Sequence, residues 1–566
     1  MRVLWAFAAY FCGMTTPILC SNNPLAVLLG RVFAGVALAA LLGAAAAAQA
    51  PAPGASFDVA DVHVRPHSSN PNPQVTGGAL RGGRYDVRNA TMLDFISLAY
   101  GVDPQTVLGG PNWLARNRFD VIAKAPDGTS RETLQLMMQS MLAERFKLVL
   151  HKDTKPVPSY VLAVNGTPKL KAAAAPADPT QSPCTPVQPA PQTSTNIPFL
   201  AFSCKGVTME TLAQFLQYTS NGYITSRAVD QTGLKGNWDI DLKWTARPML
   251  SRAGSEGITL PAALAQLGLT LTFDKAPAPV LVVDSVNDQP TANPSGNAGN
   301  LPAPPPGEFD AADIKIAAPE TAMNGRLLPN GRLDFQGATM KTLFQLAWDI
   351  TDDELLAGAP KWFDTTKYSL VAKVSTPGND ANGVQFDLDD LRVMLRTLLV
   401  ERFKIVTHIE QRPIDAYTLV VADKAKLQAA DPANRTGWFN GPAVGAKDPR
   451  ETNPALNRLI TVQNMSMAQF AEDISAMAGG YLKEPVADGT GLSGSWDFVL
   501  NFSGINVYNA GRGGDTNGGT LGASAPTGAL SLFDALEKQL GLRLEQHKRP
   551  LPVMVIDTIE ERPTDN

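Results

Sequence analysis

The chain repeats itself, and this constrains its fold more than any other feature. The stretch DQTGLKGNWDIDLKW, residues 230–244, returns as DGTGLSGSWDFVLNF, residues 488–502, with no insertion. FDVADVHV returns in the same order as FDAADIKI, TMLDFISLAYGV as TMKTLFQLAWDI, and AERFKLVLH as VERFKIVTH. Self-similarity at a long, fixed period indicates a duplicated module. The sequence therefore predicts copy one at residues 51–293, a linker at 294–307 and copy two at 308–566.

The local pattern inside each copy predicts an α+β fold. Apolar residues fall at helical spacing in RETLQLMMQSMLAERF, whereas the following FKLVLHK and SYVLAV alternate with period two. Pro156 predicts a turn between those two strands. The same order follows Leu264, where Gly268 is expected to end a short helix. We therefore expect small βαββ-like units, each a helix packed on an antiparallel hairpin, with Pro/Gly-rich linkers and exposed insertions at 172–203 and 509–528.

The first fifty residues predict export. They contain Arg2 and Arg31 but no Lys, Asp or Glu, and RVFAGVALAALLGAAAAAQA has the layout of a secretory signal peptide. An earlier apolar run leaves open the alternative that residues 1–50 form an N-terminal membrane segment, which would anchor the protein to the inner membrane. Either way the remaining chain is expected in the periplasm or secreted. Without residues 1–50 it has 46 basic and 53 acidic residues, and this acidic balance argues against nucleic acid as a partner.

Two cysteines remain after residue 50, Cys184 and Cys204, and they bracket a Pro-rich segment. An oxidising compartment permits a disulfide between them. Closing a loop of this length would stabilise the fold by about 3 kcal/mol on the chain-entropy model. A reactive dithiol or a metal pair is the alternative, although no CxxC spacing or adjacent His supports it.

The repeated stretch has a signature, D-x-T-G-L-x-G-x-W-D, that predicts a turn followed by a half-buried strand. Its glycines are expected to adopt positive φ, its first Asp to bond backbone donors, and its Trp to be buried, so that Trp→Ala would cost about 3 to 5 kcal/mol. Its last Asp should point away from the apolar face, so that its replacement by Asn would be nearly neutral. Paired carboxylates in a functional site are the alternative. The signature residues are Asp230, Gly233, Gly236, Trp238, Asp239, Asp488, Gly491, Gly494, Trp496 and Asp497.

No known catalytic motif accompanies this signature, so we expect no catalytic residue and no cofactor. His151 and His408 occupy equivalent places, and with the preceding Glu144 or Glu401 they could bind a metal or respond to pH near 6.5. The alternative is a pair of exposed histidines at strand ends. Arg145 and its counterpart Arg402 are expected as cations in the last turn of a helix, and binding of an anionic ligand is the alternative.

The ordered set of FDVADVHV, MLAERFKLVLHKDTKPVPSYVL, AVDQTGLKGNWDIDL and LPVMVIDTIEERPTDN resembles the soil-bacterial, Solibacter-type family of exported proteins, a domain of unknown function. The resemblance covers nearly the whole chain after residue 50, twice, whereas single copies are usual in the family. Copy two departs from copy one because it lacks the cysteine pair. The resemblance implies an envelope protein and supplies no catalytic residue. Some relatives occur with membrane zinc metallopeptidases of a sensor system.

The sequence thus favours a non-catalytic, extracytoplasmic module that binds or senses an envelope protein or peptide, in which a membrane metallopeptidase sensor system is one candidate partner. Contact with a membrane would occur only through residues 1–50. A hydrolase or metal-dependent enzyme, with a site built between the two copies, is the alternative.

Overall fold

The computed structural model describes residues 55–65, 74–178, 180–187, 199–220, 222–253, 256–302, 307–328, 332–350, 353–374, 388–432, 434–478, 480–482, 484–511 and 528–564. The predicted signal peptide or membrane segment, residues 1–50, lies outside these ranges. The α+β class is confirmed, since helices and antiparallel sheets alternate along both copies. Among the described residues no helix has the length and apolarity needed to cross a membrane.

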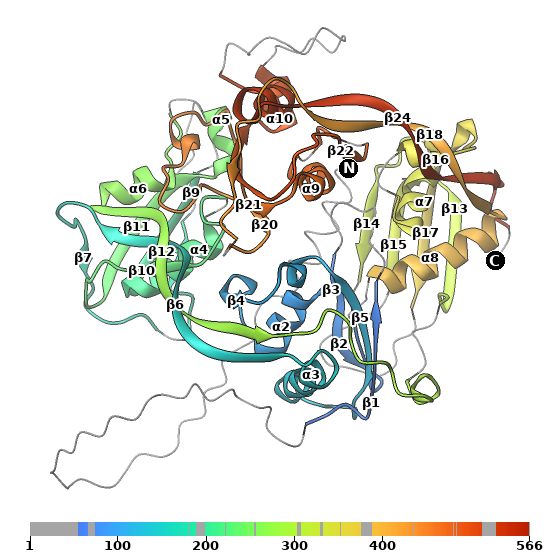
Figure 1. Ribbon diagram of the computed structural model, residues 1–566, viewed down its shortest axis with the longest axis horizontal. Coiled ribbons are helices and arrows are strands. Elements are labelled where there is room, and N and C mark those ends of the chain that lie inside the picture. The colour runs from blue at the N-terminus through green and yellow to red at the C-terminus, as the bar shows by residue number, and fades with distance from the viewer. Residues whose placement is uncertain are drawn as a thin grey trace.

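Each copy consists of two units with the same order of elements (Figure 1). We number the units one to four, at residues 55–164, 165–285, 307–421 and 422–558. Unit one contains β1 (Val59–Val64), β2 (Thr76–Arg81), β3 (Arg84–Thr91), α2 (Met92–Tyr100), β4 (Val107–Gly109), β5 (Arg118–Lys124), α3 (Arg131–Arg145) and β6 (Val149–Val164). Unit two contains β7 (Lys171–Ala172), β8 (Cys184–Pro186), β9 (Phe199–Val207), α4 (Met209–Thr219), β10 (Ala228–Asp230), β11 (Trp238–Thr245), α5 (Leu250–Ala253), α6 (Leu260–Gln266) and β12 (Leu269–Ser285).

Copy two repeats this arrangement. Unit three contains β13 (Ala311–Ile316), β14 (Asn324–Leu327), β15 (Arg332–Thr339), α7 (Met340–Trp348), β16 (Leu356–Ala357), β17 (Lys367–Lys373), α8 (Leu388–Phe403) and β18 (Val406–Val421). Unit four contains β19 (Gln428–Ala429), β20 (Gly437–Asn440), β21 (Arg458–Met465), α9 (Met467–Ala478), β22 (Val486–Asp488), β23 (Trp496–Phe502), α10 (Ile505–Gly511), α11 (Leu532–Ala535), the π-helical turn η9 (Leu536–Leu540) and β24 (Leu542–Thr558).

The four units share one sheet topology. Their four-stranded sheets have the orders β1-β5-β3-β2, β7-β11-β9-β8, β13-β17-β15-β14 and β19-β23-β21-β20, which are equivalent strand for strand. In each unit the first long helix begins directly after the third strand, and a hydroxyl side chain caps it. The capping residues are Thr91, Thr208, Thr339 and Ser466. The duplication found in the sequence is therefore part of a fourfold structural repeat, because each copy contains two equivalent units.

Two long ribbons join the units in pairs. β6 pairs antiparallel with β12 along almost its whole length, and β18 pairs in the same way with β24. Each ribbon strand packs with one half of its length in the core of its own unit and with the other half in the core of the neighbouring unit. In β6, for example, Leu150 lies in the core of unit one and Leu162 in the core of unit two. Each unit has its own cluster of buried side chains. The ribbons therefore link the two cores within each copy.

The prediction of a turn at Pro156 is wrong. Val149–Val164 is one continuous strand, and Pro156 lies opposite Pro277 in the middle of the ribbon. Only two strands run side by side there, because β4 and β10 pair with the ribbon nearer its ends. A proline is compatible with a strand whose N–H would face solvent. The helix is thus followed by a strand whose partner comes from the next unit, and the local βαββ hairpin is not formed.

The expected exposed insertion at 172–203 is partly wrong as well. Cys184–Pro186 forms β8, which pairs with β9 and places Cys184 opposite Cys204. The two cysteines form the predicted disulfide. Residues 188–198 of the same insertion, and 512–527 of the second one, lie outside the described ranges.

Reduction of this disulfide is expected to lower the free energy of unfolding by about 3 kcal/mol, because the unfolded chain regains the entropy of an open loop. Urea unfolding with and without reductant measures the difference. Alkylation followed by intact-mass measurement should find no free thiol at Cys184 or Cys204 before reduction. Copy two is the internal control, since its equivalent strand pair has no cysteine.

Candidate functional site

The signature residues form the turn that the sequence predicts. The carboxylate of Asp230 accepts hydrogen bonds from the N–H and the hydroxyl of Thr232, at 2.8 and 2.7 Å. Asp488 and Thr490 repeat both bonds, each at 2.8 Å. All four signature glycines have positive φ, between 67° and 102°. The strand that follows is half-buried, because alternate residues from Ile240 and Phe498 onward face the core.

Trp238 and Trp496 depart from the expectation, since both are only partly buried. Each side chain packs at the margin of a core, and its indole N–H is buried without a hydrogen-bond partner among the described residues. Leaving a buried donor unpaired costs about 1 to 3 kcal/mol. The cost of about 3 to 5 kcal/mol expected for Trp→Ala assumed full burial, so we now expect a smaller cost at both positions.

Asp239 and Asp497 point away from the core, but both side chains accept hydrogen bonds. The carboxylate of Asp497 accepts a hydrogen bond from the N–H of Asn464 at 2.7 Å, and Asp239 accepts one from Gly206 at 3.2 Å. Gly206 and Asn464 have positive φ and lie at the irregularity of the strand that precedes the capped helix. In unit one the carboxylate of Asp120 accepts the equivalent hydrogen bond from the N–H of Asn89 at 2.7 Å. The last Asp of the signature thus holds a strained backbone in place.

Because of this hydrogen bond we expect Asp497→Asn to destabilise the chain by about 1.5 to 3 kcal/mol, the range for a hydrogen bond to a charged group, and not to be nearly neutral. Urea unfolding of the variant measures the loss. Unit three supplies a natural comparison, because Ser369 replaces the Asp there and the residue at the irregularity is Gly337, which needs less support at positive φ. An unfolding free energy within 0.5 kcal/mol of wild type, the usual range for an exposed substitution, would contradict this role.

The two histidines lie next to aspartates and not next to the expected glutamates. Nδ1 of His151 lies 2.9 Å from an oxygen of Asp284, and Nδ1 of His408 lies 2.9 Å from Asp557. These pairs join the two strands of each ribbon and are partly exposed to solvent. No group of three or more possible metal ligands occurs in the part of the chain that the structure describes.

Ionisable groups do meet between the copies, where the alternative placed an enzyme site. Asp448 of copy two accepts a hydrogen bond from Arg450 at 2.7 Å and forms an ion pair with Arg247 of copy one at 3.1 Å, and all three side chains are at most 10% exposed. The guanidinium of Arg247 also lies over the ring of Tyr223, 4.3 Å from its centroid. Burial raises the pKa of Tyr223 to about 12 and lowers that of Arg247. These groups pair with one another and fix the orientation of the copies.

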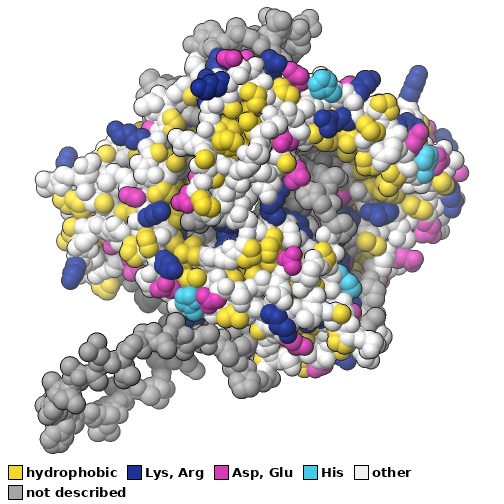
Figure 2. Space-filling model, viewed as in Figure 1, with side chains coloured by type: hydrophobic (Ala, Val, Ile, Leu, Met, Phe, Trp, Pro, Cys, Tyr) yellow, Lys and Arg dark blue, Asp and Glu magenta, His cyan; other side chains and the backbone are white. Residues whose placement is uncertain are grey.

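Other ion pairs and hydrogen bonds also join the two copies. Arg116 of unit one pairs with Glu472 of α9 at 2.7 Å, and Arg88 pairs with Asp390 of α8 at 3.1 Å. Arg435 donates to the carbonyls of Val107 and Gly109 in β4, and burial lowers its pKa to about 10. Figure 2 shows basic and acidic side chains interspersed over the visible face.

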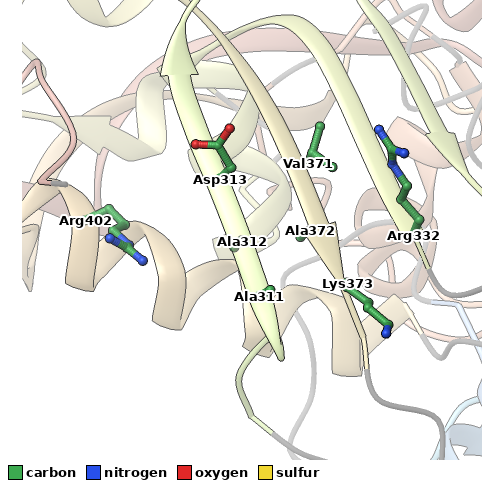
Figure 3. Close-up of a pocket in the computed structure, with 8 residues that line it drawn as sticks. All are labelled: Ala311, Ala312, Asp313, Arg332, Val371, Ala372, Lys373 and Arg402. Carbon is green, nitrogen blue, oxygen red and sulfur yellow. The ribbon is translucent and has the colours of Figure 1, made fainter. Parts of the chain in front are cut away.

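The candidate site is an open groove on the first sheet of copy two, with a volume of about 830 Å³. Figure 3 shows its charged side chains coming from four elements. Asp313 lies on edge strand β13, Lys373 on β17, Arg332 on β15 and Arg402 near the end of α8. Ala311, Ala312, Val371 and Ala372 complete the lining. The groove therefore has an apolar floor lined by one carboxylate and three cations, and one of these cations, Arg402, donates to the carbonyl of Thr564 at 3.4 Å.

In copy one the equivalent groove is occupied by the chain's own segment 291–302. The register is identical in both sheets, since Val59 and Arg84 face Lys124 as Ala311 and Arg332 face Lys373. The occupying segment follows β12 and includes the short helix η5 (Asn297–Gly299). Asn297 and Pro302 of the linker predicted at 294–307 are thus hydrogen-bonded to copy one.

Hydrogen bonds from copy one hold this segment. Arg145 donates to the hydroxyl of Thr291 at 3.1 Å, and Asp61 accepts from the side-chain amide of Asn297 at 3.0 Å. Arg84 donates to the carbonyl of Pro302 at 2.6 Å. The N–H and carbonyl of Val62 each bond the side chain of Asn293, at 2.9 and 3.1 Å.

Sequence reasoning missed this groove. The sequence predicts Arg145 and Arg402 as helix-terminal cations or as ligands for an anion, whereas Arg145 is 5% exposed and donates to Thr291, which lies 146 residues later in the chain. The available signal was the recurrence of Asp61, Arg84, Lys124 and Arg145 as Asp313, Arg332, Lys373 and Arg402. Four recurring charged residues on one sheet and its helix are more than a structural repeat requires.

Comparison with known families gives one match. The model of a family described as protein of unknown function (DUF3738) matches residues 93–286 and 341–559. No curated protein matches the chain, and no solved structure matches it.

Proposed function

The chain belongs to the DUF3738 family of proteins of unknown function, which it contains twice, and from this premise we propose that it is an exported, non-catalytic cell-envelope module that binds a protein or peptide partner. The observation that carries the proposal is the pair of equivalent grooves. One groove holds a peptide segment through side chains that the other groove also has.

The chemistry of the groove suits a polypeptide better than a small reactive substrate. Arginine side chains bind main-chain carbonyls in copy one, and a carboxylate binds a side-chain amide. Groups of these kinds recognise the polar atoms that every extended peptide presents. The predicted export signal supports binding in the envelope, and the acidic balance of the chain argues against nucleic acid as the partner.

The test is capture of a binding partner on immobilised full-length protein from a native envelope extract. The proposal expects a partner that binds saturably and that is lost when Arg332 and Lys373 are both replaced by Ala. Lys124→Ala is the matched control, because Lys124 occupies the equivalent place in the groove that is already filled. Binding that survives the double substitution would argue against this groove.

The enzyme alternative has a separate readout. Stoichiometric zinc in the purified protein, or robust turnover of a peptide, ester or peptidoglycan substrate, would overturn the non-catalytic proposal. Neither measurement depends on knowing the partner.

A further inference from the structure

We infer that a second pocket, in unit two, binds an uncharged saccharide. This pocket has a volume of about 740 Å³ and lies where α4, β10 and the middle of β12 meet (Figure 1). Pockets that hold small ligands commonly have volumes of about 300–1,000 Å³. The inference goes beyond the proposed protein or peptide partner and does not depend on it.

One face of α4 and the start of β10 supply the polar lining of the pocket. Positions 210, 214, 217 and 218 recur at helical spacing, so they share one face of α4. The side chains that carry the inference are Glu210, Gln214, Gln217, Tyr218, Arg227 and Gln231. Gln217 accepts a hydrogen bond from the N–H of Ala228 at 3.1 Å, and the other five side chains make no hydrogen bond or ion pair with the described residues. Their donors and acceptors are therefore open to a ligand.

Tyr218 gives this pocket an aromatic surface. Its side chain is 84% exposed, whereas every other Phe, Trp and Tyr side chain of the described residues is at least partly buried. The face of an aromatic ring carries negative partial charge, so it attracts the polarised C–H groups of a sugar ring that stacks on it. Polar side chains beside the ring can bind the hydroxyls of the same sugar.

The rest of the lining favours a ligand with many hydroxyls and no charge. Each glutamine offers one acceptor and two donors, and each sugar hydroxyl can both donate and accept. Glu210 and Asp230 add two carboxylates and Arg227 adds one guanidinium, so there is no excess of positive charge for a phosphate or a sulfate. The apolar residues of the lining are Ala228, Val229, Ala276 and Pro277. Their small side chains favour neither a lipid tail nor a large apolar group as the ligand.

Copy two shows that the fold does not require these polar side chains. Helices α4 and α9 both begin directly after a capping hydroxyl, and β10 and β22 pair with their ribbons in the same register. The equivalents of the six side chains are Ala468, Glu472, Ser475, Ala476, Pro485 and Gly489. Five of them carry neither a charge nor an amide, and the sixth, Glu472, pairs with Arg116 of unit one at 2.7 Å. The polar set therefore belongs to copy one alone and is not explained by packing.

The experiment titrates the full chain with two uncharged probes, cellotetraose and the tetramer of N-acetylglucosamine. Saturation-transfer difference NMR detects weak binding of such small ligands to a protein of 60.2 kDa. We expect saturable binding of at least one probe. Tyr218→Ala should weaken it at least fivefold, because the stacking surface is lost. This variant should fold normally, since Ala476 occupies the same place in α9. Tyr218→Phe should lose less, because it keeps the ring.

Leu136→Ala is the matched control. Leu136 is also an exposed side chain on a helix, at 41% exposure, but it lies on α3 of unit one. Its replacement should leave saccharide binding unchanged. Absence of binding of both probes by the wild-type chain, or equal binding by Tyr218→Ala, would overturn the inference, as would capture of a polypeptide through Tyr218 in place of a saccharide. A partner captured through Arg332 and Lys373 would still support the proposed function, so the two failures are distinguishable.

Discussion

Replacement of Asp448 by Ala is expected to lower the free energy of unfolding by about 3 to 5 kcal/mol, the cost of breaking a buried ion pair from one side. Asp448 forms ion pairs with both Arg247 and Arg450, and Arg450 is 5% exposed. Without it two guanidinium groups would face each other in a poorly hydrated interface. Urea unfolding of the full chain measures the loss.

Asp153→Ala is the matched control for this variant, because the pair between Asp153 and Lys155 is exposed. Exposed pairs contribute at most about 1 kcal/mol. If the two variants lost the same unfolding free energy, the ion pairs of Asp448 would contribute no more to stability than a surface pair, which would contradict this prediction. Arg247→Met combined with Asp448→Leu and Arg450→Met should recover most of the loss, since an apolar replacement removes the unpaired charges.

The pH dependence of the Asp448 effect follows from the direction of its pKa shift. Burial raises the pKa of Asp448, but hydrogen bonds from Arg450 and the charges of both arginines outweigh it, so the pKa lies below its ordinary value. A carboxyl whose pKa is lower in the folded state stabilises that state above its unfolded pKa, and this contribution is lost as the pH falls through the folded pKa. The difference between wild type and Asp448→Ala should therefore be full above about pH 4 and shrink below it.

Glu451 provides a contrast of opposite sign at the same interface. Burial and the charge of Asp448 raise its pKa. A carboxyl with a raised folded pKa stabilises the folded state only at low pH, and this contribution is lost as the pH rises through the folded pKa. Glu451→Gln should therefore increase stability at pH 7, in a direction opposite to Asp448→Ala.

The sequence predicted the elements whose causes are local. Turn residues such as Asp230 and Gly233 interact with neighbours a few positions away, so the signature turn could be derived from spacing alone. The long duplication was also visible, because it preserves whole stretches. The inner repeat was not visible, because units one and two share little beyond a capped helix, and α6 has 7 residues where α3 has 15.

Features that depend on distant partners could not be derived. Pro156 indicated a turn because prolines are rare in central strands, and the sequence does not show that the ribbon is only two strands wide there. The outward direction of Asp497 was right, but its partner is the N–H of Asn464, whose position depends on an irregularity in another strand. The groove of copy two could likewise be recognised only from the structure, because residues 291–302 lie in the equivalent groove of copy one.

Each unit also has a residue of positive φ after its second helix, and here the four units differ in a way that only the structure reveals. The residues are Lys147, Gly268, Lys404 and Gly541. A Cβ at Gly541 would lie 2.0 Å from the carbonyl oxygen of Lys424, and one at Gly268 would lie 2.4 Å from that of Thr167. In units one and three a lysine occupies the same position, so an L-residue is accepted there at positive φ.

Gly541→Ala is therefore expected to destabilise the chain by about 2 to 5 kcal/mol. About 1 to 2 kcal/mol comes from a side chain at positive φ, and about 1 to 3 from the overlap with backbone that must shift. The shift would strain the hydrogen bonds that Ala422 and Lys426 donate to the carbonyls of Gly541 and Leu540, at 2.9 and 2.8 Å.

Gly491→Ala isolates the second contribution. Gly491 has the same φ as Gly541, 67°, and no atom lies within 4 Å of a Cβ built there. Its replacement should cost only the conformational part, about 1 to 2 kcal/mol. Urea unfolding of both variants gives the contact term by difference. Equal losses would mean that the segment around Lys424 yields without cost, and that the glycine at this position is required by its φ alone.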